Sequence, residues 1–237
     1  MSAPRRLVVN ADDFGLSEGV NAGIVRAHEE GIVTSTSLMV HGAGAEAAAL
    51  AAARLPALGV GLHLDLAEWE CVDGEWRAVY ERVDAADAAA VAAELEAQLG
   101  RFRELLGREP GHLDSHQHVH RSEPVRSLMG ARAKELRVPL RHHGRVRYCG
   151  AFYGRGHGNA PQPGAVTPAR LAALVAGIPA GATELCCHPG RDPEPGGYGA
   201  ERVLELEALC DPGVREAADR AEVRLCTFAE ALRDLPG

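Results

Sequence analysis

The sequence has few aromatic residues and lacks the cysteine spacing of a metal or redox motif. Phe, Trp and Tyr make up 4% of the 237 residues, and the 6 cysteines show no CxxC spacing. A disulfide framework is not expected, because a chain of this size can bury a core without cross-links. No apolar run approaches the roughly 18 residues of a membrane span, and no signal-peptide pattern is recognisable. These absences predict a cytoplasmic protein with reduced thiols and no membrane partner.

Positive charge is also scarce. Lys and Arg total 25 against 33 Asp and Glu, which gives a formal net charge of -8. Such a chain repels nucleic acid on average, so we expect a small neutral or cationic substrate. Hydrophobic residues make up 46% of the sequence, enough for one sizeable core, and we expect a single domain over residues 1–237. A homodimer is compatible with these features.

Apolar runs alternate with amphipathic segments along the chain. Strands are predicted at residues 7–9, 32–40, 58–66, 112–119, 138–141, 183–187 and 223–226. Helices are predicted at residues 16–31, 43–54, 85–106, 123–136, 167–176, 200–209, 212–220 and 228–235. This alternation predicts an α/β fold with about seven parallel strands, in a (β/α) barrel-like arrangement. In such folds the active site lies at the carboxyl ends of the strands.

Two polar segments that follow predicted strands are candidates for the walls of a site. Residues 67–84 contain both tryptophans, Trp69 and Trp76, and are expected to form a lid or substrate wall. Residues 142–166 are rich in Gly and Pro without a clear period, so we expect a long loop. Phe152 and Tyr153 in this loop offer rings for stacking on a sugar, or they pack the loop itself.

Reactive side chains gather where the predicted strands end. They are Asp12 and Asp13 after the first strand, His63 and Asp65 in the third, Asp114, His116, His118 and His120 in the fourth, and His188 after the sixth. Alternate residues of an extended strand share one face, so the fourth strand is expected to present its histidines inward together. Packing explains this pattern poorly, because each buried polar group needs a partner.

A divalent metal ion is the simplest partner for these groups. One carboxylate and two imidazoles would hold it and leave positions open for water and substrate. The ion would activate water, while the second aspartate acts as general base and His188 protonates a leaving amine. The structural alternatives are helix capping by Asp12 or Asp13, for which Ser17 competes, and turn capping by His188. Spacing alone decides neither between the aspartates nor among the histidines, and leaves Zn²⁺, Mg²⁺, Mn²⁺, Ni²⁺ and Fe²⁺ open.

Several segments resemble the YdjC-like carbohydrate deacetylases, the family of chitooligosaccharide deacetylase. They are NADDFG at 10–15, GIVTSTSLMV at 31–40, GLHLDL at 61–66, HLDSHQHVH at 112–120, AFYG at 151–154 and CHPG at 187–190. The resemblance implies a (β/α) barrel-like fold and metal-dependent removal of an acetyl group from an N-acetylated sugar or short oligosaccharide, with release of acetate. It also implies one divalent ion, Mg²⁺ or Zn²⁺, and a small-molecule N-acetylated sugar as partner.

The same resemblance distributes the roles. Asp13, His63 and His116 are implied as metal ligands. Asp12 is implied as the base, and His188 as the acid that protonates the amine. These roles agree with those expected from the residue types, and they choose between alternatives that spacing leaves open.

Substrate-binding residues are expected next to these groups. We assign the remaining histidines of the HQHVH segment and the two loop aromatics to this role, namely His118, His120, Phe152 and Tyr153. Gln117 departs from the family pattern, because many relatives have a histidine there. Its side chain is expected to point away from its strand neighbours, with little effect.

Two other functions fit parts of the pattern. An Fe²⁺ oxygenase also uses two histidines and one carboxylate, but the alternation of strands and helices disfavours it. A non-catalytic sugar- or metal-binding protein would keep the pocket, but the presence of both Asp12 and His188 argues against it. A metal-dependent deacetylase is therefore the leading hypothesis.

Overall fold

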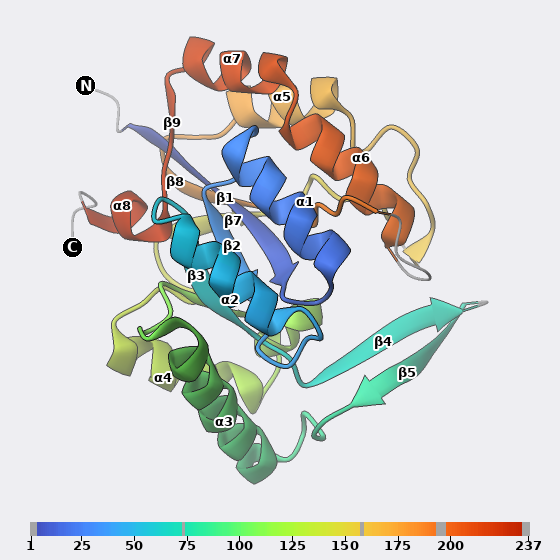
Figure 1. Cartoon of the computed structure of the whole chain (residues 1–237), viewed down its shortest axis with the longest axis vertical. Coiled ribbons are helices and arrows are strands. Elements are labelled where there is room, and N and C mark those ends of the chain that lie inside the picture. Colours follow the sequence, from blue (N-terminus) through green and yellow to red (C-terminus); the bar gives the residue numbers. More distant parts are fainter. Residues whose placement is uncertain (1–3, 73, 157–158, 193–197, 234–237) are drawn as a thin grey trace.

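The main sheet is parallel, as the sequence predicts. The computed structural model describes residues 4–72, 74–156, 159–192 and 198–233. The strands of the sheet are β1 (Arg5–Phe14), β2 (Ser35–Leu38), β3 (Gly59–Leu64), β6 (Leu113–Ser115), β7 (Val146–Cys149), β8 (Gly181–Cys187) and β9 (Val223–Leu225). This 7-stranded sheet has the order β6-β3-β2-β1-β8-β7, with β9 paired to the start of β1, and all its pairs are parallel (Figure 1). Within the described residues, β6 and β7 are the two ends of the order.

Helices alternate with these strands and cover the sheet (Figure 1). They are α1 (Glu18–Glu29), α2 (Ala45–Arg54), α3 (Ala88–Leu106), α4 (Val125–Leu136), α5 (Pro168–Ala176), α6 (Gly199–Leu209), α7 (Pro212–Arg220) and α8 (Phe228–Arg233). Each lies within a few residues of its prediction, and positions 234 and 235 of the last predicted helix lie outside the described residues. In the described part of the chain, no helix combines the length and apolar character needed to cross a membrane.

Helix capping does not occupy the paired aspartates. The Ser17 hydroxyl accepts a hydrogen bond from Val20 N at 3.1 Å and so caps α1. This satisfies one of the free N–H groups at the start of the helix. Asp12 and Asp13 both lie inside β1, before the cap, and are therefore free for other contacts.

One predicted strand is misplaced. Residues 138–141 contribute to the sheet through a single isolated bridge, from Leu140 to Leu113, whereas β7 lies within the segment expected to be a loop. The prediction was wrong because β7 has four residues, and half-buried Val146 and Tyr148 alternate with exposed Arg147 over too short a stretch to be recognised.

The polar segment after β3 is an antiparallel hairpin. Its strands are β4 (Ala67–Val72) and β5 (Glu75–Glu81), which pair antiparallel and project from the body of the molecule (Figure 1). β5 is largely exposed, so the hairpin gains little from core packing. The base of the hairpin follows the end of β3 directly, and this connection fixes the position of the hairpin.

The fourth predicted strand ends much earlier than expected. After Ser115 the chain forms the short 3₁₀ helix η1 (His116–Arg121), in which Gln117 and His118 have φ of 50° and 55°. The hydroxyl of Ser115 accepts a hydrogen bond from the backbone N–H of His120 at 3.0 Å and stabilises the turn. The expected alternation of Asp114 and the three histidines on one strand face is therefore wrong, because left-handed residues break the period of two.

Close backbone packing holds the end of β8 in place. A Cβ atom at Gly23 in α1 would lie 2.5 Å from Gly190 Cα, in the turn that follows β8. Real Cβ atoms do not approach so closely, so position 23 requires glycine. The turn that carries His188 is thus held against α1.

Candidate metal centre and active site

Both aspartates of β1 reach the same end of the sheet. Adjacent residues of a regular strand point to opposite faces, but Asp13 has φ of 68°, and the register with β2 shifts between Ala11 and Phe14. This irregularity acts as a β-bulge, which redirects side chains. As a result both carboxylates lie near His63 at the carboxyl edge of the sheet.

Asp13, His63 and His116 converge as the resemblance implies. Asp13 Oδ1 lies 3.4 Å from His63 Nε2 and 3.2 Å from His116 Nδ1, and the three side chains offer ligand atoms within 4.8 Å of one another. Asp13 Oδ1 is buried and has no hydrogen-bond partner of good geometry. Its other oxygen, Oδ2, accepts a bond from Arg202 Nη2 at 2.6 Å. One oxygen is therefore held while the other faces the two imidazoles.

The surroundings of His63 suit a cation. Its Nδ1 lies 2.7 Å from Asp114 Oδ1, a contact that orients the ring and leaves Nε2 toward Asp13. Burial alone would lower the pKa of His63, but the carboxylates of Asp114 and Asp12 raise it to about 10. The pocket thus stabilises positive charge, and a buried, unpartnered carboxylate oxygen beside two imidazole nitrogens fits a divalent metal ion. We call Asp13, His63 and His116 the metal triad.

Asp12 has different contacts from its neighbour. Arg141 donates to both of its oxygens, from Nη1 to Oδ2 at 2.6 Å and from Nη2 to Oδ1 at 2.7 Å. Asn10 Nδ2 adds a bond to Oδ1 at 2.9 Å. Burial alone would raise the pKa of Asp12, but the Arg141 guanidinium holds it at about 2. The carboxylate is therefore ionised and fixed, with neither oxygen free in the way that Asp13 Oδ1 is.

Arg141 is the centre of a buried ionic network. Its fully buried guanidinium also contacts Asp114 Oδ2 at 2.8 Å and Glu184 Oε1 at 2.7 Å. Burial raises the pKa of Glu184 to about 7, although Arg141 opposes this. The network joins β1, β6 and β8 below the site and fixes Asp12 and Asp114.

His188 lies across from Asp12. Its Nε2 is 3.9 Å from Asp12 Oδ2, and its backbone N–H donates to Glu205 Oε2 at 2.5 Å. Burial alone would lower the pKa of His188, but the Glu205 carboxylate raises it above its ordinary value. An imidazole that holds its proton beside a fixed carboxylate is suited to donate that proton.

The loop aromatics have separate positions. Tyr153 is 37% exposed, stacks on Tyr198 with ring centroids 4.5 Å apart, and lies 5.5 Å from the ring of His188. Phe152 is fully buried in the hydrophobic core, so the expectation that it faces a sugar is wrong. The side chains of Phe152 and Tyr153 therefore point in opposite directions, and the Phe152 ring lies in the core. Tyr153 remains at the rim of the site.

The hairpin is tied to the site at its base. Asp65 accepts hydrogen bonds from Tyr80 and Arg82 at 2.9 Å each, so it anchors β5 and is no part of the reactive cluster. The Gln117 side chain makes two hydrogen bonds with the backbone of Trp69. Its Oε1 accepts from Trp69 N at 3.0 Å, and its Nε2 donates to Trp69 O at 2.6 Å. Gln117 therefore ties the hairpin to η1, a contact that the sequence did not predict. Trp69, 40% exposed, is held next to η1.

His118 and His120 lie in η1 but contact other groups than the triad. His118 Nε2 is 3.1 Å from the Tyr148 hydroxyl, and His120 Nδ1 is 2.5 Å from Ser115 Oγ. His120 is fully buried, so it is not presented to a bound sugar. Both histidines form a separate cluster with His142.

Several residues around the site were not expected from the sequence. Arg202 and Glu205 come from α6, where an acid and a base three residues apart suggest only a solvated helix face. Glu184 could have been recognised from the sequence, because it is a single charged residue inside the apolar strand β8. Cys186 Sγ lies 3.4 Å from Asp12 Oδ2, whereas Cys187 points into the core. Adjacent residues of a strand point to opposite faces, so the two thiols do not face the same group.

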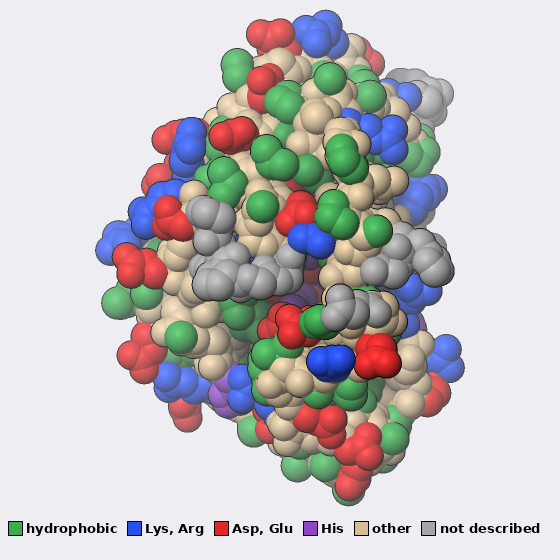
Figure 2. Space-filling view, turned by 90° about the vertical axis from the view of Figure 1, so that its right-hand side faces the viewer, with side chains coloured by type: hydrophobic (Ala, Val, Ile, Leu, Met, Phe, Trp, Pro, Cys, Tyr) green, Lys and Arg blue, Asp and Glu red, His purple; other side chains and the backbone are tan. Residues whose placement is uncertain are grey.

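The surface is hollowed on the side from which the hairpin projects. Figure 2 shows this hollow, with acidic and histidine side chains visible in and around it. The side chains of His116 and His188 are 12% and 20% exposed, so the site reaches solvent.

Comparison with known proteins identifies relatives over nearly the whole chain. Residues 6–220 match the family of YdjC-like proteins. The carbohydrate deacetylase of Geobacillus stearothermophilus is 36% identical over 251 aligned residues, which cover 96% of this chain and 98% of that protein. The chitooligosaccharide deacetylase of Salmonella paratyphi B is 40% identical over 148 residues, covering 58% of this chain and 59% of that protein.

Solved structures share the fold. A protein of Enterococcus faecalis V583 described as a cellobiose-phosphate cleavage protein superimposes with a TM-score of 0.79 at 24% identity, covering 96% of this chain and 99% of its own. A family 4 acetyl xylan esterase from Clostridium thermocellum, solved with a cobalt ion, gives a TM-score of 0.54 at 12% identity, covering 98% of this chain and 93% of its own. The likeness supports a parallel α/β barrel-like fold for this chain.

Proposed function

The chain belongs to the YdjC-like family, and we propose that it is a metal-dependent carbohydrate deacetylase, which hydrolyses the N-acetyl group of an N-acetylated sugar or short chitooligosaccharide and releases acetate. The observation that carries this proposal is the position of Asp12 and His188. Their side chains lie 3.9 Å apart beside the metal triad, one a fixed carboxylate and the other a proton-holding imidazole. Such a pair suits amide hydrolysis, because water loses a proton and the amine gains one.

The metal triad would hold one divalent ion. When bound, the ion supplies polarisation of the acetyl carbonyl and a lowered pKa for water. Two imidazole nitrogens with one carboxylate oxygen suit Zn²⁺ better than Mg²⁺, which prefers oxygen ligands. The cobalt ion in the Clostridium thermocellum esterase is in keeping with a transition-metal site in proteins of this fold.

Proton transfer is the task of the two flanking residues. Asp12 Oδ2, the oxygen that faces His188, would receive the proton of the attacking water, and Arg141 keeps the carboxylate in place throughout. His188 Nε2 would give its proton to the sugar nitrogen as the C–N bond breaks, while Glu205 supports the charged imidazole. The products are acetate and a free amine, so atoms and protons balance.

The rim offers two rings for the sugar. Tyr153 lies beside His188, and Trp69 lies on the hairpin, which Gln117 fixes next to η1. A pyranose presents an apolar face on which aromatic rings stack and polar edges that need hydrogen bonds. We propose that Tyr153 contacts the acetylated residue and that Trp69 contacts a neighbouring unit of the oligosaccharide.

Acetate release over a panel of sugars tests the proposal. N-acetylated mono-, di- and trisaccharides are compared with O-acetylated sugars, and metal content is determined on the same samples. We expect acetate and free amine in equal amounts, loss of activity on chelation and recovery with Zn²⁺. A protein that binds metal but releases no acetate from any member of the panel would overturn the proposal and support a binding function.

A further inference from the structure

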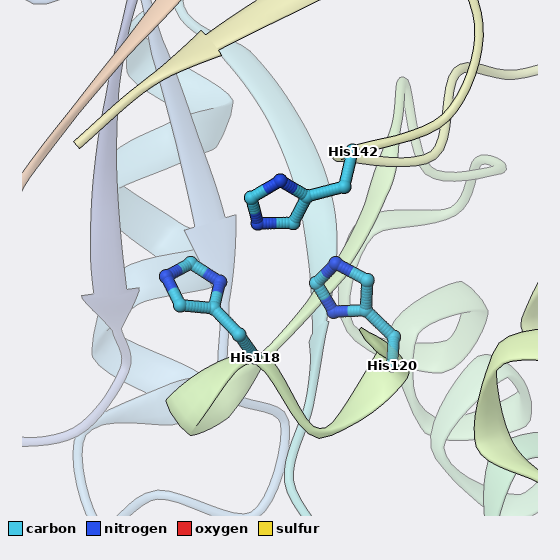
Figure 3. Close-up of side chains that lie close together, drawn as sticks. All are labelled: His118, His120 and His142. Carbon is cyan, nitrogen blue, oxygen red and sulfur yellow. The ribbon is translucent and has the colours of Figure 1, made fainter. Parts of the chain in front are cut away.

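A second histidine cluster lies outside the machinery assigned to deacetylation. His118, His120 and His142 offer ring nitrogens that lie within 4.8 Å of one another. Figure 3 shows the three rings around a common space, two from η1 and one from the segment that precedes β7. Ring centroids are 5.1 to 5.9 Å apart.

Each ring has a buried nitrogen without a partner. These are His118 Nδ1, His120 Nε2 and His142 Nε2. A buried polar atom that makes no hydrogen bond costs free energy, so three of them in one place need an explanation. A ligand that accepts three nitrogen lone pairs would satisfy all of them at once.

Two of the rings are held from behind. His120 Nδ1 lies 2.5 Å from Ser115 Oγ, and His118 Nε2 lies 3.1 Å from the hydroxyl of Tyr148. Each hydroxyl can accept the ring N–H, which leaves the lone pair on the opposite nitrogen and directs it inward. Metal-ligating histidines are typically oriented by such an outer partner. His63 has the same arrangement in the metal triad, with Asp114 in the outer position.

We propose that His118, His120 and His142 bind a second divalent cation of the zinc class, distinct from the ion of the metal triad. Three imidazoles suit Zn²⁺, Cu²⁺ or Ni²⁺, and they suit Mg²⁺ or Ca²⁺ poorly, because those ions prefer oxygen. Three protein ligands also leave a fourth position for water. The proposal does not depend on deacetylation.

The positive charge of Arg141 does not forbid the site. Arg141 adjoins His142, but its guanidinium is bound to three carboxylates, which belong to Asp12, Asp114 and Glu184. The network therefore carries no excess positive charge. A cation held by the three imidazoles would therefore not meet an excess of positive charge from this network.

The location suggests what the ion does. His118 and His120 follow β6, while His142 precedes β7, and these strands are the two ends of the sheet order. Within the described residues, the two strands are not paired with each other. The segment before His142 already pairs with β6, through the bridge from Leu140 to Leu113 and the hydrogen bond from Arg141 N to Leu113 O at 3.0 Å. An ion bound by all three histidines would add a link between η1 and the connection that leads to β7.

Metal stoichiometry tests the inference. Untagged protein is stripped with a chelator, equilibrated with Zn²⁺ and analysed by mass spectrometry of the metal. We expect two ions per chain in the wild type and one in His142→Asn, since asparagine tolerates the left-handed backbone of position 142, where φ is 63°. His143→Asn is the matched control, because it removes a neighbouring histidine outside the cluster, and it should retain two ions.

The variant His63→Ala isolates the new site. It should retain one ion, and Co²⁺ bound to it should give the visible absorption of a nitrogen-ligated site, which disappears in His63→Ala combined with His142→Asn. The second equivalent of Zn²⁺ should also raise the Tm of the wild type but not of His142→Asn. One ion in the wild type and none in His63→Ala would overturn the inference, as would two ions in His142→Asn.

Discussion

The metal triad and the second histidine cluster use the same side chain in opposite surroundings. His116 and His118 are separated by one residue, yet His116 faces a carboxylate and His118 faces two further imidazoles. The outer partner of His63 is the carboxylate of Asp114, whereas His118 and His120 are oriented by hydroxyls. A carboxylate makes the ring more basic than a hydroxyl does. The neighbours, more than the ligand type, therefore set the charge that each site favours.

Burial acts on both groups of histidines, but with different results. Carboxylates overcome burial at His63, whose pKa rises to about 10. Burial prevails in the second cluster, where it lowers the pKa of His118 to about 3 and those of His120 and His142 to about 4. One cluster thus stabilises positive charge by itself, while the other consists of neutral rings.

The largest effect is expected for two residues of the active site, Asp12 and the triad ligand His63. Asp12→Asn should lower kcat by about 10²- to 10⁴-fold, the usual contribution of a general base, while the triad ion is retained. His63→Ala should lose the triad ion together with the activity, because it removes a ligand. Acetate release and metal content are measured on both variants. Equal metal loss in the two would refute the division of labour between Asp12 and the triad.

The next effect concerns the ionic network around Arg141, which fixes Asp12 and Asp114. Arg141→Met leaves Asp12, Asp114 and Glu184 without their common partner, and it should lower the free energy of unfolding by about 3–5 kcal/mol. The matched control is Arg220→Met, which breaks an exposed pair with Glu216 and should cost about 0–1 kcal/mol. Denaturant unfolding measures both, and similar costs for the two variants would contradict a special role for Arg141.

A smaller effect is expected on the metal affinity of the second cluster. Ser115→Ala removes the hydroxyl that orients His120, and loss of an outer partner typically weakens metal binding by about 10- to 100-fold. Competition with a chromogenic zinc chelator measures the affinities of both sites. The affinity of the triad should change little, and Ser122→Ala on exposed chain nearby serves as the control. A loss confined to the triad would be the opposite of what the contacts predict.

The smallest effect lies between the two clusters. Gln117→Ala removes two hydrogen bonds to the backbone of Trp69, each worth about 1 kcal/mol net. The KM for an N-acetylated trisaccharide should rise by up to about tenfold, with a smaller change in kcat, because the hairpin is less well fixed. Trp76→Ala, on the exposed part of the hairpin, is the control. If both variants shift KM equally, the hydrogen bonds of Gln117 do not position the hairpin for substrate.

Much of the fold follows from local patterns. The alternation of apolar runs and amphipathic segments predicts a parallel sheet, and the cap at Ser17 marks the start of α1 correctly. Placing Asp12, His63 and His188 at strand ends brings them together, because parallel strands share a carboxyl edge. These features depend on periods and end signals, which the sequence carries directly.

The remaining features depend on tertiary contacts or on single backbone angles. The left-handed residues Gln117 and His118 end the strand character of residues 112–119, and no propensity announces them at a glutamine and a histidine. The pairing of Arg141 with Asp12 joins positions 129 residues apart, which no local pattern contains. Such contacts decide which aspartate keeps a free oxygen, so spacing could not separate the two roles.

Anchoring of His118 and His120 has an evolutionary consequence. Both rings are held by partners that do not involve His142, which sits on the connection before β7. A single codon change at position 142 therefore adds or removes the third ligand, while the triad and its proton-transfer groups stay untouched. For the proposed second ion, a change at this one position would alter metal-dependent stability without touching the catalytic residues.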